Sequence, residues 1–357
     1  MVPNYESNML NLEKKINSHF LKWYYQNKRE LPWRKSFKYN LPNPYYIFVS
    51  EYMLQQTTVN TVKERFIEFI NKWPSLEKLS RATEPEILKF WSGLGYYSRA
   101  RYLLKAAKLI KKNYNNNIPK TYDELIALPG IGDYTAKAIL GIAYNKPVMP
   151  TDANIERIIV RLFAINKPIS KIKDKLKSIA NNFVSKKYSS NLIQAFMDYG
   201  SIICVPRNPK CDVCIINSLC ESHKKNLQSL LPLKLKKISK KPIKYTRAYV
   251  LINEKDEILV RKRPARGMLA SMLEIPNDAW VESKKHLSYD KVIKSYKNKL
   301  KRKGSFEYSF SHFDLQAEIF FTNIKKSEIS KGNWLKKTQY SKSALPTVMK
   351  KIVQIAV

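Results

Sequence analysis

Four cysteines, the whole complement of the chain, fall within a short stretch with the spacing C-x6-C-x2-C-x5-C, at Cys204, Cys211, Cys214 and Cys220. No cysteine is left to pair elsewhere, so clustered thiolates at this spacing indicate a metal centre rather than a disulfide framework. Structural zinc sites usually carry two Cys-x2-Cys pairs, and this run has one. Short four-cysteine runs also hold iron–sulfur clusters. The spacing favours a cluster, with zinc as the alternative and four free thiols as the least expected arrangement.

The composition is strongly basic. The 357 residues include 65 Lys or Arg and 29 Asp or Glu, a formal net charge of +36, and the excess is spread over both halves of the chain. This balance predicts a nucleic acid partner, against a generic basic surface as the alternative. The sequence has neither an apolar run long enough to span a membrane nor the apolar core of a signal peptide. We therefore expect a cytoplasmic protein, nucleoid-associated if bacterial. A monomer is also expected.

The pattern of apolar residues divides the chain into two domains. Residues 1–225 repeat apolar side chains at helical spacing, broken by Pro-containing and Gly-containing turns. Residues 226–244 are rich in lysine and lack carboxylates, which is typical of a linker. Residues 245–357 contain alternating stretches that predict strands at 247–252, 257–261, 306–312 and 315–321, with a helix at 291–301. The sequence thus predicts a mostly α domain followed by a smaller α+β domain.

A helical hairpin is predicted over residues 121–144, with Leu-Pro-Gly-Ile-Gly at its turn. Gly130 and Gly132 allow positive φ and a close approach of the backbone. The turn opens a helix N-terminus, whose free N–H groups bind phosphate without reading sequence. In so basic a chain this favours contact with the DNA backbone over an ordinary helical hairpin.

Two carboxylates stand out. Asp152 precedes the apolar-periodic segment IERIIVRLF, where Asp is a good N-cap, and the alternative is a catalytic carboxylate beside the hairpin. Glu51 lies in an apolar stretch that we place early in a helix, with Gln55 on the same face. It is either the acid of a capping box or a buried acid with a raised pKa. The residues themselves favour the N-cap for Asp152 and leave the choice open for Glu51.

Several segments, taken together, resemble the MutY family of adenine DNA glycosylases, which belongs to the helix–hairpin–helix superfamily with endonuclease III. They are Leu31-Pro-Trp-Arg, Ser50-Glu-x-Met-Leu-Gln-Gln-Thr, Gly93-Leu-Gly-Tyr-Tyr-Ser-Arg-Ala-Arg, Leu128-Pro-Gly-Ile-Gly-Asp-Tyr-Thr and the four-cysteine run. The likeness runs in order from about residue 17 to 223. It continues through 263–269 and Phe310-Ser-His in a second domain that is similar to a Nudix fold. The resemblance implies one 4Fe–4S cluster on the four cysteines.

The resemblance also implies roles in removing adenine from pairs with 8-oxoguanine or guanine in double-stranded DNA. Glu51 would protonate the flipped adenine, Asp152 would stabilise the sugar cation, and Tyr134 and Asn154 would support them. Residues implied to contact the DNA or its bases are Arg34, Gln55, Tyr96, Gly130, Gly132, Gln194, Ser311 and His312. For Tyr96 a place in the core is the alternative, and for Ser311 and His312 an edge strand.

Position 134 bears on strand cleavage. Bifunctional relatives place a nucleophilic Lys there to form a Schiff base with the sugar, and this chain has Tyr, which predicts base excision without efficient strand cleavage. We expect Lys137 to contact a phosphate. The alternatives are a glycosylase–lyase for oxidised pyrimidines and a DNA-binding iron–sulfur protein without catalysis. The sequence departs from the family at Ala153, where Gly is usual, and in a longer connection over 35–46.

A working Nudix box is not expected. Gly267 is followed by a segment with one Glu and then a Pro, instead of the Glu-rich helix that would hold magnesium. Nucleotide hydrolysis is therefore not predicted for the second domain.

Overall fold

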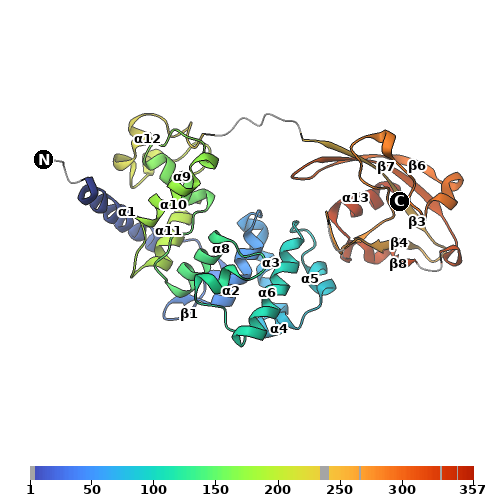
Figure 1. Ribbon diagram of the computed structural model, residues 1–357, viewed down its shortest axis with the longest axis horizontal. Helices are drawn as coiled ribbons and strands as arrows, with labels where there is room; N and C mark the ends of the chain where they lie inside the picture. Colours follow the sequence, from blue (N-terminus) through green and yellow to red (C-terminus); the bar gives the residue numbers. More distant parts are fainter. Residues whose placement is uncertain (1–4, 234–240, 265–266, 330–331, 344) are drawn as a thin grey trace. The chain divides into compact units, whose positions relative to one another are not determined.

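The computed structural model describes residues 5–233, 241–264, 267–329, 332–343 and 345–357. The chain divides into two compact units, Met1–Arg81 with Tyr102–Lys236 and Ala82–Arg101 with Lys237–Val357 (Figure 1). Of the expected linker, residues 234–240 lie outside the described residues, and the boundaries at 225 and 245 stay predictions.

The first unit is helical, as the spacing of its apolar residues predicts. Its helices are α1 (Tyr5–Asn27), α2 (Pro44–Leu54), α3 (Val59–Lys72), α4 (Leu76–Ser80), most of α6 (Ser98–Tyr114), α7 (Tyr122–Ile126), α8 (Asp133–Ala138), α9 (Ala153–Leu162), α10 (Lys173–Asn181), α11 (Ser189–Ile202) and α12 (Glu221–Lys224). Short 3₁₀ turns lie at Pro32–Arg34, Ile169–Lys171, Cys211–Val213 and Asn217–Leu219, and a π-helical turn at Ile139–Ala143 continues α8. The helix α5 (Glu84–Phe90) belongs to the second unit.

Helix α11 is the centre of the first unit and is apolar over most of its surface, so it is buried between α1 and α9. Phe196 of α11 stacks on Phe20 of α1 with ring centroids 4.2 Å apart. Tyr199, one turn further along α11, meets Phe20 edge to face at 4.7 Å. Figure 1 shows α1 and α11 lying side by side. The packing fixes α11, and with it the start of the cysteine run that follows.

The long connection over 35–46 forms a small hairpin of β1 (Ser36–Lys38) and β2 (Leu41–Pro42). Tyr39 and Asn40 make its turn with φ of 53° and 57°. The chain then enters α2 through Asn43, whose side chain accepts the backbone N–H of Tyr45 at 2.9 Å, with Pro44 at the first helical position. These signals set the start of α2 well before Glu51.

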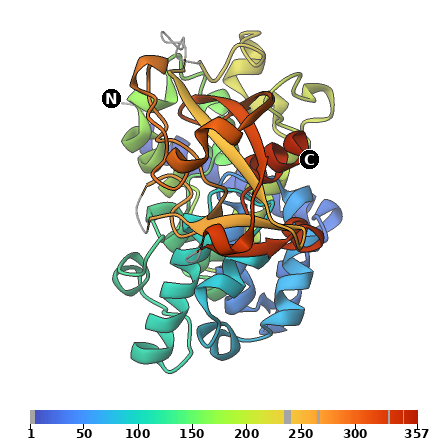
Figure 2. The same cartoon turned by 90° about the vertical axis from the view of Figure 1, so that its right-hand side faces the viewer.

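The second unit is built on a mixed sheet in the order β5-β4-β3-β7-β6, with β8 paired to β4. Its strands, coloured orange to red in Figures 1 and 2, are β3 (Ile243–Ile252), β4 (Glu257–Lys262), β5 (Leu273–Glu274), β6 (Lys301–Ser309), β7 (Asp314–Asn323) and β8 (Asn333–Lys336). Strands β3 and β7 run parallel, and the other pairs are antiparallel. The four strands predicted from the sequence are present, although β6 ends at Ser309 and leaves 310–312 as a loop.

Each face of this sheet is covered. Helix α13 (Thr347–Ala356) buries Val348, Met349 and Ile352 against Val250 and Ile319. On the opposite face lie two short 3₁₀ segments, Lys284–His286 and Lys294–Lys299. Two more 3₁₀ segments, Lys326–Glu328 and Lys337–Lys342, lie near the C-terminal end. The helix expected at 291–301 is therefore wrong: only a 3₁₀ segment forms, because its many lysines stay in water and Ile293 and Tyr296 alone are buried.

Candidate active site

A cavity in the first unit brings together side chains from α2, α8, the start of α9 and α11. Glu51, Tyr134, Asp152 and Asn154 all line it. The remaining lining residues are Arg29, Leu31, Trp33, Arg34, Ile47, Leu54, Gln55, Gln56, Thr57, Val59, Ile142, Ala153, Met197 and Ser201. The lining combines two carboxylates with apolar side chains and with arginine, amide and hydroxyl groups, a mixture that suits a polar organic ligand.

Glu51 lies near the C-terminal end of α2 and is 6% exposed. The expectations of an early helical position and of a capping box are both wrong, since Asn43 and Pro44 begin the helix seven residues earlier. Burial raises the pKa of Glu51, a hydrogen bond from Tyr134 and the charge of Arg34 lower it, and the charge of Asp152 raises it, so that the pKa is about 7. The side chain is thus poised to give up a proton near neutral pH.

Asp152 is the N-cap of α9, so the N-cap role predicted from the sequence is confirmed. One carboxylate oxygen accepts the backbone N–H groups of Asn154 at 3.0 Å and Ile155 at 2.7 Å. The other accepts the side-chain amide of Asn154 at 2.8 Å. Burial raises the pKa of Asp152, and these three hydrogen bonds oppose that rise. The cap and the cavity are compatible, because the same carboxylate lines the site.

Asn154 is itself held by Arg157, whose Nη2 donates to its side-chain oxygen at 2.8 Å. Arg157 also donates to the carbonyl oxygens of Ala153 at 3.0 Å and Cys204 at 2.7 Å. The carbonyl of Ala153, the position where the family usually has Gly, is therefore fixed within the first turn of α9.

A buried ion network at the wall of the cavity was missed by the sequence analysis. Asp198 of α11 is fully buried and accepts two hydrogen bonds from Arg34, at 2.7 and 2.9 Å. It also accepts the side chain of Arg29 at 2.7 Å and its backbone N–H at 3.0 Å. The only signal for this role is a carboxylate in the apolar run of α11, since a buried charge needs a partner.

Gln194 lies one turn before Asp198 and is 2% exposed. It lines a neighbouring cavity, which shares Arg29, Leu31 and Arg34 with the first one. Its amide nitrogen donates to the Ser190 carbonyl at 3.0 Å, and its oxygen has no hydrogen-bond partner among the described residues. The structure therefore separates Gln194 from the two carboxylates, with Arg34 between the two cavities.

The hairpin turn packs closely against the site. Gly130 has a φ of 81°, whereas Gly132 has an ordinary φ of −107° and is the N-cap of α8, so only the first needs to be glycine for its backbone conformation. Gln55 donates to the Gly130 carbonyl at 3.3 Å. Lys137, expected to contact phosphate, pairs with Asp133 at 3.0 Å.

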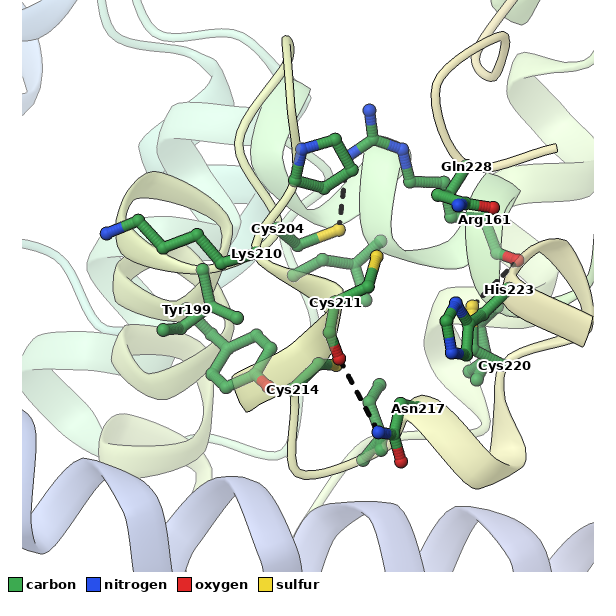
Figure 3. A pocket seen from close by; sticks show the side chains of 15 residues that line it. Arg161, Tyr199, Cys204, Lys210, Cys211, Cys214, Asn217, Cys220, His223 and Gln228 are labelled. Atoms are coloured by element: carbon green, nitrogen blue, oxygen red, sulfur yellow. Dashed lines mark hydrogen bonds between the residues drawn. The ribbon is translucent and has the colours of Figure 1, made fainter. Parts of the chain in front are cut away.

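The four cysteines line one cavity at the end of α11 (Figure 3). Arg161 of α9 is 2% exposed and donates to the Cys204 sulfur at 3.4 Å and to the carbonyls of Val205 and Pro206. Tyr199 accepts the backbone N–H of Ile215 at 2.9 Å and fixes the middle of the loop. Within the part of the chain that the structure describes, no three His, Cys, Asp or Glu side chains lie close enough together to hold a single metal ion. All four cysteines line the same cavity.

Three expected residues lie in the second unit. Ser311 and His312 are exposed in the loop between β6 and β7. The hydroxyl groups of Ser311 and Tyr96 share a hydrogen bond. Tyr96 is 40% exposed with a φ of 45°, so the alternative that places it in the core is wrong.

Gly267–Met272 form turns rather than a helix. Among all the described helices, none is long and apolar enough to cross a bilayer.

Comparison with known proteins decides the family. Residues 49–183 match the HhH-GPD superfamily base excision DNA repair protein, 204–220 the iron-sulfur binding domain of endonuclease III, and 247–354 the NUDIX domain. The adenine DNA glycosylase of Buchnera aphidicola subsp. Baizongia pistaciae is 34% identical, over 93% of this chain and 94% of that protein. The chain belongs to the adenine DNA glycosylase family.

More distant relatives agree. The human adenine DNA glycosylase is 28% identical over 94% of this chain and 72% of its own length. A solved thermostable thymine-DNA glycosylase is 28% identical and covers 60% of this chain and 98% of its own, with a TM-score of 0.54. This chain is thus a DNA glycosylase of base excision repair with a helix–hairpin–helix domain, an iron–sulfur binding loop and a Nudix-like domain.

Proposed function

We propose that this glycosylase hydrolyses the N-glycosidic bond of adenine paired with 8-oxoguanine or guanine, and leaves the DNA strand intact. The observation that carries the proposal is the pairing of two different carboxylates in one cavity: Glu51 buried with a pKa near 7, and Asp152 held by three N–H donors. Burial favours the protonated form of Glu51, whereas the three N–H donors favour the ionised form of Asp152. Two carboxylates in such different environments suit one general acid and one anion.

The reaction begins when adenine leaves the base stack and enters the cavity, because its glycosidic bond is out of reach inside a duplex. Glu51 transfers its proton to a ring nitrogen of the base. The bond to the sugar breaks, its electron pair goes to adenine, and positive charge develops on the sugar. Asp152 stabilises that charge, as a carboxylate does at the oxocarbenium centre of glycoside hydrolysis. Water then adds to the sugar carbon and returns a proton to Glu51.

The supporting residues follow from their contacts. Asn154 orients Asp152 through the 2.8 Å hydrogen bond between their side chains. Tyr134 donates to Glu51 and offers no amine to attack the sugar, which supports hydrolysis over a Schiff-base mechanism. Gln55 and Tyr96 enter the duplex, the Gly130 turn binds the backbone, Arg34 borders the base, and Ser311 and His312 read the opposite base. Gln194 lines the neighbouring cavity and has no role at the base.

The iron–sulfur loop holds a 4Fe–4S cluster in this proposal. Four separate thiols around a common cavity support a cluster, and the Arg161 N–H directed at the Cys204 sulfur suits a thiolate ligand. Cys204, Cys211, Cys214 and Cys220 would hold the cluster, and the loop between the first two carries Arg207 and Lys210, two cations suited to DNA phosphate. Elemental analysis should give about four irons per chain, and stoichiometric zinc without iron would contradict this cofactor.

One gel experiment tests the activity. Labelled duplexes with A:8-oxoguanine, A:G and T:A pairs are incubated with the protein and analysed with and without alkali. The proposal predicts strand breaks only after alkali, first for A:8-oxoguanine, then for A:G, and none for T:A. Breaks without alkali would indicate a lyase. An intact strand under both conditions, with DNA still bound, would indicate a DNA-binding protein without catalysis.

A further inference from the structure

Two buried polar atoms on the wall of the cysteine cavity have no hydrogen-bond partner among the described residues. They are Nδ1 of His223 and Oε1 of Gln228, and both side chains line the same cavity as the four cysteines. Buried polar atoms are nearly always paired, because an unpaired one forfeits the hydrogen bond that water would give it. A group bound in the cavity, which both side chains line, would supply the missing partners.

The chain places both side chains by a tight turn directly after Cys220. Helix α12 carries His223, and its end is closed by hydrogen bonds from Asn226 N–H to the His223 carbonyl at 3.1 Å and from Leu227 N–H to the Ser222 carbonyl at 2.7 Å. Gln228 follows and returns the chain to the cavity wall. Figure 3 shows His223 beside Cys220 and Gln228 beside Arg161.

Both side chains can act as donors toward this cavity. A neutral imidazole carries a proton on either nitrogen, so Nδ1 can donate. The Gln228 amide presents either its oxygen or its nitrogen, because the last torsion of Gln has a roughly two-fold profile. The sulfurs of an iron–sulfur cluster and of its thiolates accept hydrogen bonds. A side chain that bonds to these sulfurs must therefore present a hydrogen-bond donor.

We propose that His223 and Gln228 donate N–H hydrogen bonds to sulfur atoms of the cluster and thereby raise its reduction potential. The proposal rests on the iron–sulfur cofactor of the proposed function. Reduction adds negative charge to the cluster, and a donor aimed at a sulfur stabilises the more negative state. Arg161 already supplies one such donor to Cys204, and the two further side chains line the same cavity.

The test uses the purified full-length protein with its cluster. Iron and sulfide are measured first in wild type, His223→Leu, His223→Gln, Gln228→Leu and Ser229→Ala, an exposed neighbour that serves as the control. The reduction potential of each is then measured by redox titration followed by electron paramagnetic resonance. We expect a lower potential in both Leu variants, a return toward wild type in His223→Gln, and no change in Ser229→Ala. Wild-type potentials in both Leu variants with full iron would overturn the proposal.

A second measurement needs no substitution and applies even where a Leu variant fails to assemble its cluster. Wild-type protein labelled with ¹⁵N-histidine is examined by electron–nuclear double resonance in a paramagnetic state of the cluster. Of the four histidines, His223 is the one that lines the cavity, so a ¹⁵N coupling to the cluster is expected, and its absence would overturn the assignment of His223. Zinc in the wild-type metal analysis would instead refute the cofactor itself, which keeps the two failures apart.

Discussion

Both carboxylate oxygens of Asp198 accept hydrogen bonds from Arg34, at 2.7 and 2.9 Å. These bonds hold the Arg34 cation in the wall between two cavities. Burial raises the pKa of Asp198, but the hydrogen bonds and charges of Arg34 and Arg29 outweigh it and hold the pKa below the ordinary value. The Arg34 charge in turn lowers the pKa of Glu51. One carboxylate of α11 thus acts on the proposed general acid through an arginine.

Asp198→Asn should destabilise the fold strongly. The substitution leaves two arginines beside a neutral amide, and breaking a buried ion pair by removing one partner costs roughly 3–5 kcal/mol. The free energy of unfolding from urea titrations measures the effect. Glu68→Gln is the control, because it breaks the exposed pair with Arg65 and should cost at most about 1 kcal/mol. Equal effects of the two substitutions would show that the Asp198 network contributes little to stability.

Glu51→Gln and Asp152→Asn should each nearly abolish adenine release and retain DNA binding. Both changes keep the shape of the side chain, and Asn is as good an N-cap as Asp, so α9 should stay intact. Single-turnover excision and a gel-shift titration separate the two properties. Circular dichroism checks the fold, and excision at wild-type rates by either variant would refute its role.

The excision rate should fall as the pH rises through about 7. Glu51 acts in its protonated form, which is present below its pKa and lost above it. Tyr134→Phe removes a hydrogen bond that lowers this pKa, so the descending limb should move to higher pH in that variant. Single-turnover rates between about pH 6 and 9, at saturating protein, give the profile. A limb that stays in place or moves to lower pH would show that Tyr134 does not donate to Glu51.

The sequence predicts the helical domain and the α+β domain, because periods of 3.6 and 2 are local properties. It also singles out both carboxylates, although Glu51 was placed too early in its helix. The partner of Arg34 was missed because Asp198 follows it by more than 160 residues, and such pairings depend on how α11 packs. The parallel pairing of β3 with β7 is hidden for the same reason, since 61 residues, 253–313, lie between the strands.

Ser311→Ala should reduce the preference for A:8-oxoguanine over A:G. An 8-oxoguanine carries a donor at N7 where guanine has an acceptor, and a hydroxyl can accept from that donor. Losing such a contact removes about 1–3 kcal/mol of discrimination, up to roughly a hundredfold. Ser311 also shares a hydrogen bond with Tyr96, so Tyr96→Phe should shift the ratio in the same direction. The ratio of specificity constants for the two duplexes is the measurement, with the exposed Ser305→Ala as control. An unchanged ratio in Ser311→Ala would place lesion reading elsewhere.

Gly130→Ala should weaken both the fold and DNA binding, whereas Gly132→Ala should do neither strongly. A Cβ at Gly130 would lie 2.8 Å from Cβ of Tyr102 and 2.9 Å from Cε1 of Tyr52, and its φ of 81° costs an L-residue about 1–2 kcal/mol. Tyr52 donates to the Pro129 carbonyl, so displacing its ring also disturbs the turn proposed to bind the DNA backbone. At Gly132 nothing lies within 4 Å, and the cost is the weaker capping by Ala, at most about 1 kcal/mol. Urea unfolding and gel-shift titrations of both variants test the contrast. If Gly132→Ala weakened DNA binding as much as Gly130→Ala, the turn's close packing would not be what positions it for DNA.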